Sequence, residues 1–298
     1  MLQIILTIIF LLAVIFIIVT VIDSNRFIVR EYTLENEKIK EKIDLVLLAD
    51  LHNKQYGKEN KKLLEVLDKI HPDAVMSAGD ILTAKPGKGY ERAARFMERI
   101  ASKYHVYYGL GNHEYRMKIY PEDYQDEFMQ YTTRLKKAGV VVLDNESAVF
   151  SVKKGTENTN LRITGVSLTR SYYKRFSKIF MPADYLDRLA GESSQDLFQI
   201  LLAHNPEYFK EYADWGADLV LSGHIHGGIM RLPVLGGVVS PKLVLFPKYD
   251  GGLFKKGTCS MVLSRGLGMH TIPIRLFNPG ELVVIHLTPC EAGQRLVK

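Results

Sequence analysis

Two histidines, His224 and His226, stand one residue apart shortly after the apolar run 219–221. That run is typical of the end of a buried strand, and alternate residues of a strand point to the same face. We therefore expect the two imidazoles to project together, and the glycines on both sides leave room for an ion or a phosphate. Neutral imidazoles are common metal ligands. Taken alone, such a pair is more often two loop histidines than a metal site.

Potential ligands also follow four other predicted strands. The strands are the apolar runs 43–49, 74–78, 106–110 and 197–203, and the residues that follow them are Asp50 and His52, Asp80, Asn112 and His113, and His204. Each has an ordinary explanation by itself, such as a helix cap for Asp80 or a turn for Asn112. Sites in open α/β sheets form outside the carboxyl ends of strands, so the coincidence at five strand ends favours one shared site. The other histidines read as surface or packing residues: His71, His105, His270 and His286.

These ligand types indicate the kind of metal. Carboxylate, imidazole and amide ligands without cysteine suit Mn, Fe or Zn better than Ca, which prefers oxygen alone. The ligands are too many for one ion. Two divalent ions that share one carboxylate would use them all, at a separation of roughly 3.5–4 Å.

The elements that position these residues alternate between strand and helix in the first half of the chain. Helices are predicted at 58–70, 91–100, 121–137 and 207–213, and a loosely alternating edge strand at 26–34. Short strands follow at 139–143, 148–152, 161–166, 217–222, 260–263 and 281–287, with a Pro- and Gly-rich excursion at 230–254. This order predicts an α/β fold with two sheets rather than one parallel sheet. No Gly-x-Gly-x-x-Gly or phosphate-loop motif supports nucleotide binding of those kinds.

The net charge and the distribution of basic residues indicate which kinds of partner the protein could bind. The 298 residues carry a formal net charge of +6, which fits a surface that attracts anions such as phosphate or acidic lipid. Basic residues are scattered and no basic-aromatic arm is present, so no specific nucleic-acid binding is predicted. The two cysteines, Cys259 and Cys290, have no metal or disulfide spacing.

Residues 2–22 are almost uniformly apolar and long enough to cross a bilayer as a helix. A cleaved signal peptide would want a basic start and a small-residue cleavage site, and neither is present. We therefore predict a single-pass transmembrane anchor at 2–22, a catalytic domain at 26–288 and a polar tail at 289–298. Arg26 and Arg30 follow the span and favour a cytoplasmic domain, but so few charges leave the side of the membrane open.

The ligand motifs have a familiar order. Asp50-x-His52, Gly79-Asp80, Gly111-Asn112-His113-Glu114, His204 and Gly223-His224-x-His226 resemble the complete motif series of the calcineurin-like metallophosphoesterases, across residues 43–228. The stretches 245–249 and 264–268, with the N-terminal span, resemble a bacterial membrane-associated phosphodiesterase branch.

The resemblance implies two mixed β-sheets packed face to face with helices outside. It also implies two ligand sets that share Asp80: Asp50, His52, Asp80 and His226 for one ion, and Asp80, Asn112, His204 and His224 for the other. A hydroxide that bridges the ions would attack phosphorus in line. His113, as an imidazolium, would stabilise the phosphoryl charge or protonate the leaving oxygen.

Departures from the family pattern indicate the substrate. Ser/Thr protein phosphatases of this family carry arginines where this chain has Ala84 and Leu110, so a phosphodiester or pyrophosphate is favoured over a phosphoprotein. The anchor suggests a lipid-linked or cell-envelope substrate. Two alternatives stay open: a nuclease or nucleotide phosphodiesterase, and a catalytically silent scaffold of the same fold. The oligomeric state is also open.

Overall fold

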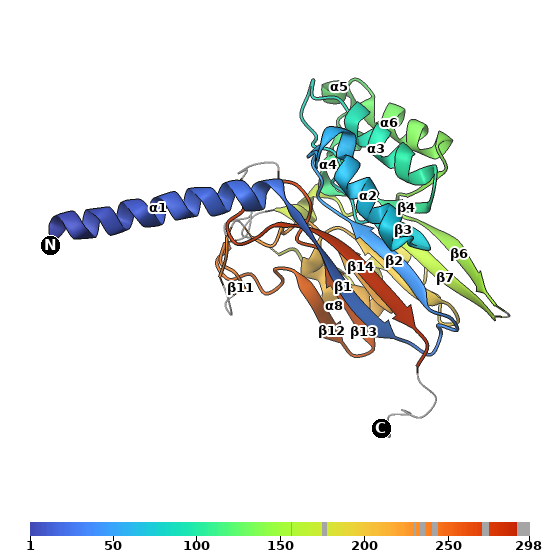
Figure 1. Ribbon diagram of the computed structural model, residues 1–298. Helices are drawn as coiled ribbons and strands as arrows, with labels where there is room; N and C mark the ends of the chain where they lie inside the picture. Colours follow the sequence, from blue (N-terminus) through green and yellow to red (C-terminus); the bar gives the residue numbers. More distant parts are fainter. Residues whose placement is uncertain are drawn as a thin grey trace.

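The structure is a computed structural model that describes residues 1–155, 157–174, 178–228, 230–232, 236–239, 244–269 and 274–290 (Figure 1). His270, expected at the surface or in packing, lies outside the described residues. So does most of the predicted tail at 289–298.

The first sheet has six strands in the order β1-β14-β2-β3-β4-β5. Their bounds are β1 Phe27–Glu35, β14 Gly280–Thr288, β2 Ile43–Leu48, β3 Ala74–Ser77, β4 His105–Gly109 and β5 Val140–Leu143. Strands β2 to β5 are parallel, whereas β14 is antiparallel to β2 and parallel to β1. The sheet is therefore mixed, and β1 is the edge strand that the sequence predicts.

The second sheet also has six strands, in the order β12-β13-β9-β8-β7-β6. Their bounds are β12 Gly252–Lys256, β13 Cys259–Leu263, β9 Leu219–Ser222, β8 Phe198–Ala203, β7 Glu157–Val166 and β6 Glu146–Lys154. Its four central strands are parallel and both edge strands are antiparallel to their neighbours. Strand β12 begins inside the Pro- and Gly-rich stretch 230–254, for which no strand was predicted. Two short strands, β10 Arg231–Leu232 and β11 Gly236–Gly237, pair separately.

The two sheets pack face to face with helices outside both (Figure 1). Alternation along β2 shows why: Leu45 and Leu47 belong to the core between the sheets, while Val46 and Leu48 pack under the helices. The helices over the first sheet are α2 Lys61–Ile70, α3 Glu91–Ala101, α4 Asn112–Ile119, α5 Pro121–Tyr124 and α6 Glu127–Lys137. Over the second sheet lie α7 Tyr185–Ala190 and α8 Phe209–Trp215, and single 3-10 turns occupy η1 Lys58–Asn60, η2 Arg170–Tyr173 and η3 Pro206–Tyr208. This confirms the predicted sandwich of two mixed sheets.

One helix prediction was wrong and one helix was missed. The single helix expected at 121–137 is broken between α5 and α6, because Gln125 and Asp126 have positive φ of 48° and 59°. Helix α4 was not predicted, and it begins at Asn112, directly at the carboxyl edge of the sheet.

The N-terminal helix α1 Leu2–Asn25 projects away from the sandwich (Figure 1). Its most apolar window has a mean hydropathy of 3.4, and none of that window is buried against the protein. The helix is long and apolar enough to cross a membrane, a test that an N-terminal signal sequence also passes.

Candidate metal centre

The five ligand-bearing strand ends meet at one place. Strands β2, β3 and β4 are parallel neighbours in the first sheet, and β8 and β9 are parallel neighbours in the second. Their carboxyl ends therefore open at the same edge of the sandwich. Three overlapping groups of side chains have ligand atoms within 4.8 Å of one another: Asp50, His52 and His226; His52, Asp80 and His113; and Asp50, Asp80 and His204.

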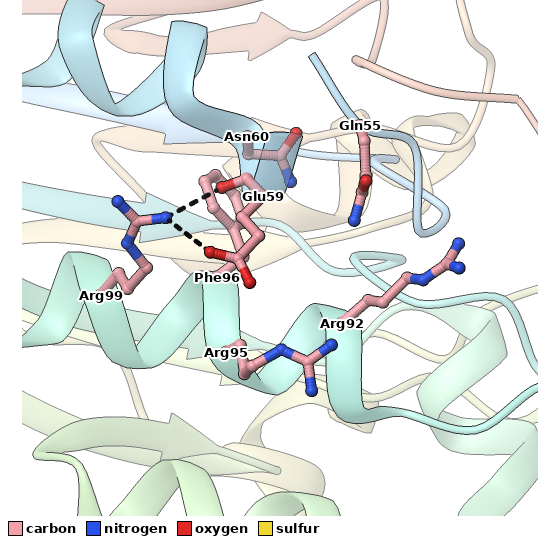
Figure 2. Close-up of a pocket in the computed structure, with 7 residues that line it drawn as sticks. All are labelled: Gln55, Glu59, Asn60, Arg92, Arg95, Phe96 and Arg99. Carbon is pink, nitrogen blue, oxygen red and sulfur yellow. Dashed lines mark hydrogen bonds and ion pairs between the residues drawn. The ribbon is translucent and has the colours of Figure 1, made fainter. Parts of the chain in front are cut away.

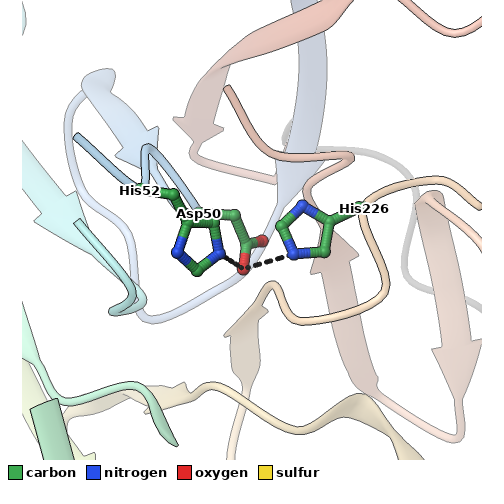
Figure 3. Close-up of side chains that lie close together, drawn as sticks. All are labelled: Asp50, His52 and His226. Carbon is green, nitrogen blue, oxygen red and sulfur yellow. Dashed lines mark ion pairs between the residues drawn. The ribbon is translucent and has the colours of Figure 1, made fainter. Parts of the chain in front are cut away.

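Asp50 lies between His52 and His226 (Figure 3). Its Oδ1 is 3.8 Å from Nε2 of His52 and 3.6 Å from Nε2 of His226. The backbone N–H of His224 donates to both carboxylate oxygens, at 3.1 and 2.9 Å, and so holds the carboxylate in this orientation. Burial raises the pKa of Asp50 to about 7, although the nearby charge of His204 opposes the shift. A cation here would stabilise the charged carboxylate.

Asp80 occupies the middle of the cluster and uses its two oxygens differently. Oδ1 accepts the backbone N–H of His113 at 2.8 Å. Oδ2 lies 3.7 Å from Nε2 of His52 and 3.2 Å from Nε2 of His204. Burial alone would raise the pKa of this carboxyl, but His204 and His113 hold it well below its usual range. Asp80 is thus a buried anion that faces three histidines, which suits a carboxylate shared by two cations.

Hydrogen bonds at Nδ1 fix which ring nitrogen faces the cluster. Nδ1 of His204 lies 2.7 Å from the carbonyl oxygen of Ala78, and Nδ1 of His226 lies 3.1 Å from that of Gly268. A carbonyl can only accept, so both Nδ1 atoms carry hydrogen. Each Nε2 is left to face a carboxylate, which is the arrangement of a metal-binding histidine oriented by a backbone carbonyl.

His113 has the opposite arrangement. Its Nδ1 accepts the backbone N–H of Ala84 at 2.9 Å, so the hydrogen of the neutral ring is on Nε2. Nε2 is 4.0 Å from Oδ2 of Asp80. Burial lowers the pKa of His113, in agreement with a neutral ring. The ring therefore presents an N–H group to the cluster, and the imidazolium expected from the sequence is disfavoured because it would leave Ala84 without its acceptor.

Asn112 supplies a test of whether the cluster fits metal ions. Its Oδ1 is buried and accepts no hydrogen bond from the described residues. An uncompensated buried carbonyl oxygen is costly, and a cation next to it would satisfy it. Together with buried carboxylates and histidines in ligand orientation, this oxygen fits a site for divalent cations.

The imidazoles of His224 and His226 do not project together from one face of a strand, so that prediction was wrong. Both residues lie in the loop after β9 with positive φ, 75° and 55°, so the alternation of an extended strand does not apply. Asp50 and His52 also have positive φ, 52° and 50°. The two imidazoles diverge: the ring of His226 stacks on His52 at 5.1 Å, and the ring of His224 packs edge-on against His204 at 5.2 Å.

The glycines beside these histidines make room for protein groups. A Cβ at Gly223 would lie 2.5 Å from Oδ2 of Asp50, and one at Gly227 would lie 2.6 Å from Oδ1 of Asn278. The clearance expected for a phosphate is therefore filled, at these two positions, by the side chains that hold the loop.

Glu114 was not assigned a role from the sequence, although it stands in a quoted motif. Its buried carboxylate accepts backbone N–H groups from Asp80 at 2.9 Å, Ile81 at 3.0 Å and Gly111 at 3.0 Å. The hydroxyl of Tyr108 donates to it at 2.6 Å. Burial raises the pKa of Glu114 to about 7, with a further contribution from Asp80. Glu114 thus ties the loop that carries Asp80 to the start of α4, which carries Asn112 and His113.

Arg275 and Asn278 lie before β14 and were also missed. Arg275 is 2% exposed, and Nη2 donates to the carbonyls of Arg265, Gly266 and Gly268, at 3.0, 3.0 and 2.7 Å. Gly268 is also the carbonyl that orients His226. Asn278 donates from Nδ2 to the carbonyls of His226 and Gly228, at 2.8 and 2.7 Å. Because their partners are main-chain carbonyls rather than complementary side chains, no local pattern identifies these residues.

A pocket lies between η1 and α3 (Figure 2). Its lining includes Arg92, Arg95 and Arg99, and Arg99 donates to the carbonyl of Glu59 at 3.2 Å. None of the metal-ligand residues predicted from the sequence lines this pocket. The chemistry described above therefore belongs to the strand-end cluster.

Comparisons with known proteins show what the chain is similar to. The family model of the calcineurin-like phosphoesterases matches residues 43–228. A Bacillus subtilis protein named uncharacterized metallophosphoesterase YkuE is 24% identical over 86% of this chain and 84% of its own length. The Escherichia coli phosphodiesterase YaeI is 25% identical over 75% of this chain and 74% of its own length. A solved structure of the Haemophilus influenzae NAD nucleotidase aligns with a TM-score of 0.46 and 17% identity, over 76% of this chain and 45% of that one.

Proposed function

The chain belongs to the calcineurin-like phosphoesterase family, and from that premise we propose that it is a membrane-anchored phosphodiesterase that works with two divalent metal ions. The convergence of five strand ends around Asp50 and Asp80 carries the proposal. Both carboxylates are fully buried beside histidines, a combination that costs free energy unless cations or protons compensate it. The similarity to a protein named as a phosphodiesterase supports the reaction type.

The ligand sets follow the division of the two histidines. We assign one ion to Asp50, His52, Asp80 and His226, and the second to Asp80, Asn112, His204 and His224. The stack of His226 on His52 and the contact of His224 with His204 support this division. The mixture of oxygen and imidazole ligands suits Mn, Fe or Zn.

Two divalent ions bound here would activate water for attack on phosphorus and neutralise charge on the phosphoryl oxygens. The chain itself contributes His113, whose Nε2–H faces the cluster and can hydrogen-bond to a phosphoryl or leaving oxygen. Ala84 fixes this tautomer through its backbone N–H. Glu114 holds Asp80 and the start of α4 in register, so donor and ligands keep their spacing.

Buried apolar side chains favour a diester over a phosphoprotein. Ala84 and Leu110 are 7% and 2% exposed, at the positions where protein phosphatases of the family carry arginines. Neither offers a guanidinium to the three non-bridging oxygens of a phosphomonoester. A diester has less negative charge to neutralise, so it depends less on such arginines.

Packing at the end of α1 supports a retained anchor rather than a cleaved signal. Asp23 is 2% exposed, and its Oδ2 accepts the backbone N–H of Asn278 at 3.1 Å. Arg26 forms an ion pair with the same carboxylate at 2.8 Å. Removal of α1 would take away the carboxylate that positions Asn278, and Asn278 holds the loop of His226. The membrane location makes a lipid-linked or cell-envelope diester the favoured substrate class.

The direct test uses the full chain in detergent micelles with Mn²⁺ and bis(p-nitrophenyl) phosphate. Hydrolysis and bound metal should both be lost in Asp80→Asn and kept in Asp214→Asn, where the carboxylate is at the surface and pairs with Lys210. Metal binding by the wild type without hydrolysis of any diester would indicate a silent scaffold. Hydrolysis confined to DNA, with strongly salt-dependent binding, would indicate a nuclease.

A further inference from the structure

An aromatic side chain from the far end of the sequence lies against the apolar part of α1. The rings of Phe277 and Phe16 meet edge to face, with centroids 6.4 Å apart. Phe16 precedes Asp23, the first charged side chain, by seven residues, or about 10 Å along a helix. A bilayer that surrounds α1 as far as Asp23 therefore also reaches Phe277.

Phe277 belongs to a group of exposed apolar side chains in two loops. Ile274 and Phe277 are 42% and 43% exposed, and Leu245 and Phe246 are 65% and 57% exposed. Phe277 and Phe246 both have positive φ, 53° and 47°, an uncommon conformation for bulky residues. Strained residues that turn apolar rings outward point to a functional surface rather than to packing.

Main-chain hydrogen bonds connect the two loops side by side. The N–H of Arg231 donates to the carbonyl of Leu276 at 3.0 Å, and the N–H of Val238 donates to that of Met230 at 2.9 Å. The N–H of Phe246 then donates to the carbonyl of Val238 at 2.9 Å. The described parts of the two loops thus belong to one laterally bonded array next to α1.

Polar and basic groups mark the end of this apolar region. Lys54 donates from Nζ to the side-chain oxygen of Asn25 at 3.2 Å, and the side chain of Arg26 is 54% exposed. Basic side chains at the end of an apolar helix are typical of the headgroup level of a membrane with acidic lipid.

We propose that residues 244–246 and 274–277 form a second membrane contact, which lies in the lipid bilayer beside α1. The proposal rests on the anchoring of α1 proposed above. Lipid is the occupant that fits, because the loops continue the exposed apolar surface of α1 and stand level with it through Phe16 and Phe277. A protein partner at this place would have to displace the lipid that surrounds α1.

The contact holds the metal centre at the membrane surface. Asn278 is the next residue after the second loop, and its side chain binds the carbonyls of His226 and Gly228. Lys54 binds the end of α1 two residues after His52. The loops that carry His52 and His226 are therefore hydrogen-bonded to the segments that meet the membrane. This places the cluster within reach of phosphodiesters in lipid headgroups.

The test places tryptophan at chosen positions of the full chain, reconstituted in phosphatidylcholine and phosphatidylglycerol vesicles with brominated acyl chains. Phe277→Trp and Phe246→Trp report on the two loops, and Phe10→Trp reports on α1. Val149→Trp is the matched control, since Val149 is an exposed apolar residue of β6. The unmodified chain, with its single Trp215, gives the baseline.

Bromolipid should quench the emission of Phe277→Trp, Phe246→Trp and Phe10→Trp, and leave Val149→Trp at the baseline. Quenching of Phe10→Trp alone would overturn the second contact and leave the anchor intact. Quenching of the loop variants alone would overturn the anchor and, with it, a contact that lies beside α1 in the bilayer. No quenching at any of the three positions would overturn both.

Discussion

His113 and His204 turn Nε2 toward the same oxygen, Oδ2 of Asp80, at 4.0 and 3.2 Å. Their Nδ1 atoms have opposite partners, a backbone N–H of Ala84 for His113 and the carbonyl of Ala78 for His204. Neutral His204 therefore offers a lone pair at Nε2, whereas neutral His113 offers a hydrogen. The two rings therefore have different chemistry beside the same carboxylate oxygen.

We expect His113→Ala to keep its metal and lose turnover. We proposed above that the ring donates to the reacting group and is not a ligand, so a loss of about 10²–10⁴-fold in kcat is expected for a group of this kind. Metal content by mass spectrometry and kcat on bis(p-nitrophenyl) phosphate measure the two effects. The control is His71→Asn at an exposed position with φ of 50°, which asparagine tolerates. Near-normal turnover in His113→Ala would show that the ring has no such role.

Metal uptake should release a proton from His204. Burial by itself lowers the pKa of this ring, but Asp80 and Asp50 raise it to about 9 in the metal-free protein. Below that pH a cation must displace the proton on Nε2, so the affinity for Mn²⁺ should fall as the pH falls from about 9. Calorimetric titration in two buffers of different ionisation enthalpy counts the protons. The His204→Ala variant should release one fewer, and equal proton release from both proteins would contradict the assignment.

Asn278→Asp should weaken metal binding although Asn278 is not itself a proposed metal ligand. The substitution places carboxylate oxygens against the carbonyls of His226 and Gly228 and near Asp23, all of which repel it. Loss of an outer support of a metal-binding histidine typically costs about 10–100-fold in affinity. Competition with a chelator measures this, and Asn158→Asp on an exposed hairpin is the matched control. Unchanged affinity would mean that the loop of His226 does not depend on Asn278.

Phe277→Ser should lower the rate of hydrolysis of membrane-bound substrates but not of soluble ones. If the loop holds the site against the bilayer, its loss should lower hydrolysis of a phosphodiester carried by vesicle lipid and spare hydrolysis of bis(p-nitrophenyl) phosphate. Val149→Ser, which changes an exposed apolar residue of β6, should affect neither. Equal rates of the wild type on both substrates would count against a lipid-linked substrate.

The positions of the ligands could be predicted because the sequence itself shows where each buried strand ends. Buried apolar runs such as 43–49 end at polar residues, and parallel strands bring these ends together. The backbone at the ligands could not be predicted in the same way. Asp50 and His224 adopt left-handed conformations without glycine, and their neighbours in space, not in sequence, stabilise that geometry.

The same limit explains the elements that were missed. Helix α4 has a polar first turn at Asn112 to Glu114, so its apolar periodicity is weak. The break begins at Gln125, a residue type that usually continues a helix. Arg275 gives no local signal, because it is a charged side chain whose partners are five main-chain carbonyls.

The pairing of β1 with β14 also sets an order of events during synthesis. Strand β1 follows α1 immediately, yet its partner is the last strand of the sandwich, and the ion pair of Arg30 with Glu281 joins residues 251 apart. The helix leaves the ribosome long before the first sheet can close. With α1 as the proposed anchor, a chain emerging in this order would commit α1 to the membrane first, and the support that Asn278 gives to His226 would form only when translation is nearly complete. The nascent protein would then be tethered before the proposed metal centre could be finished.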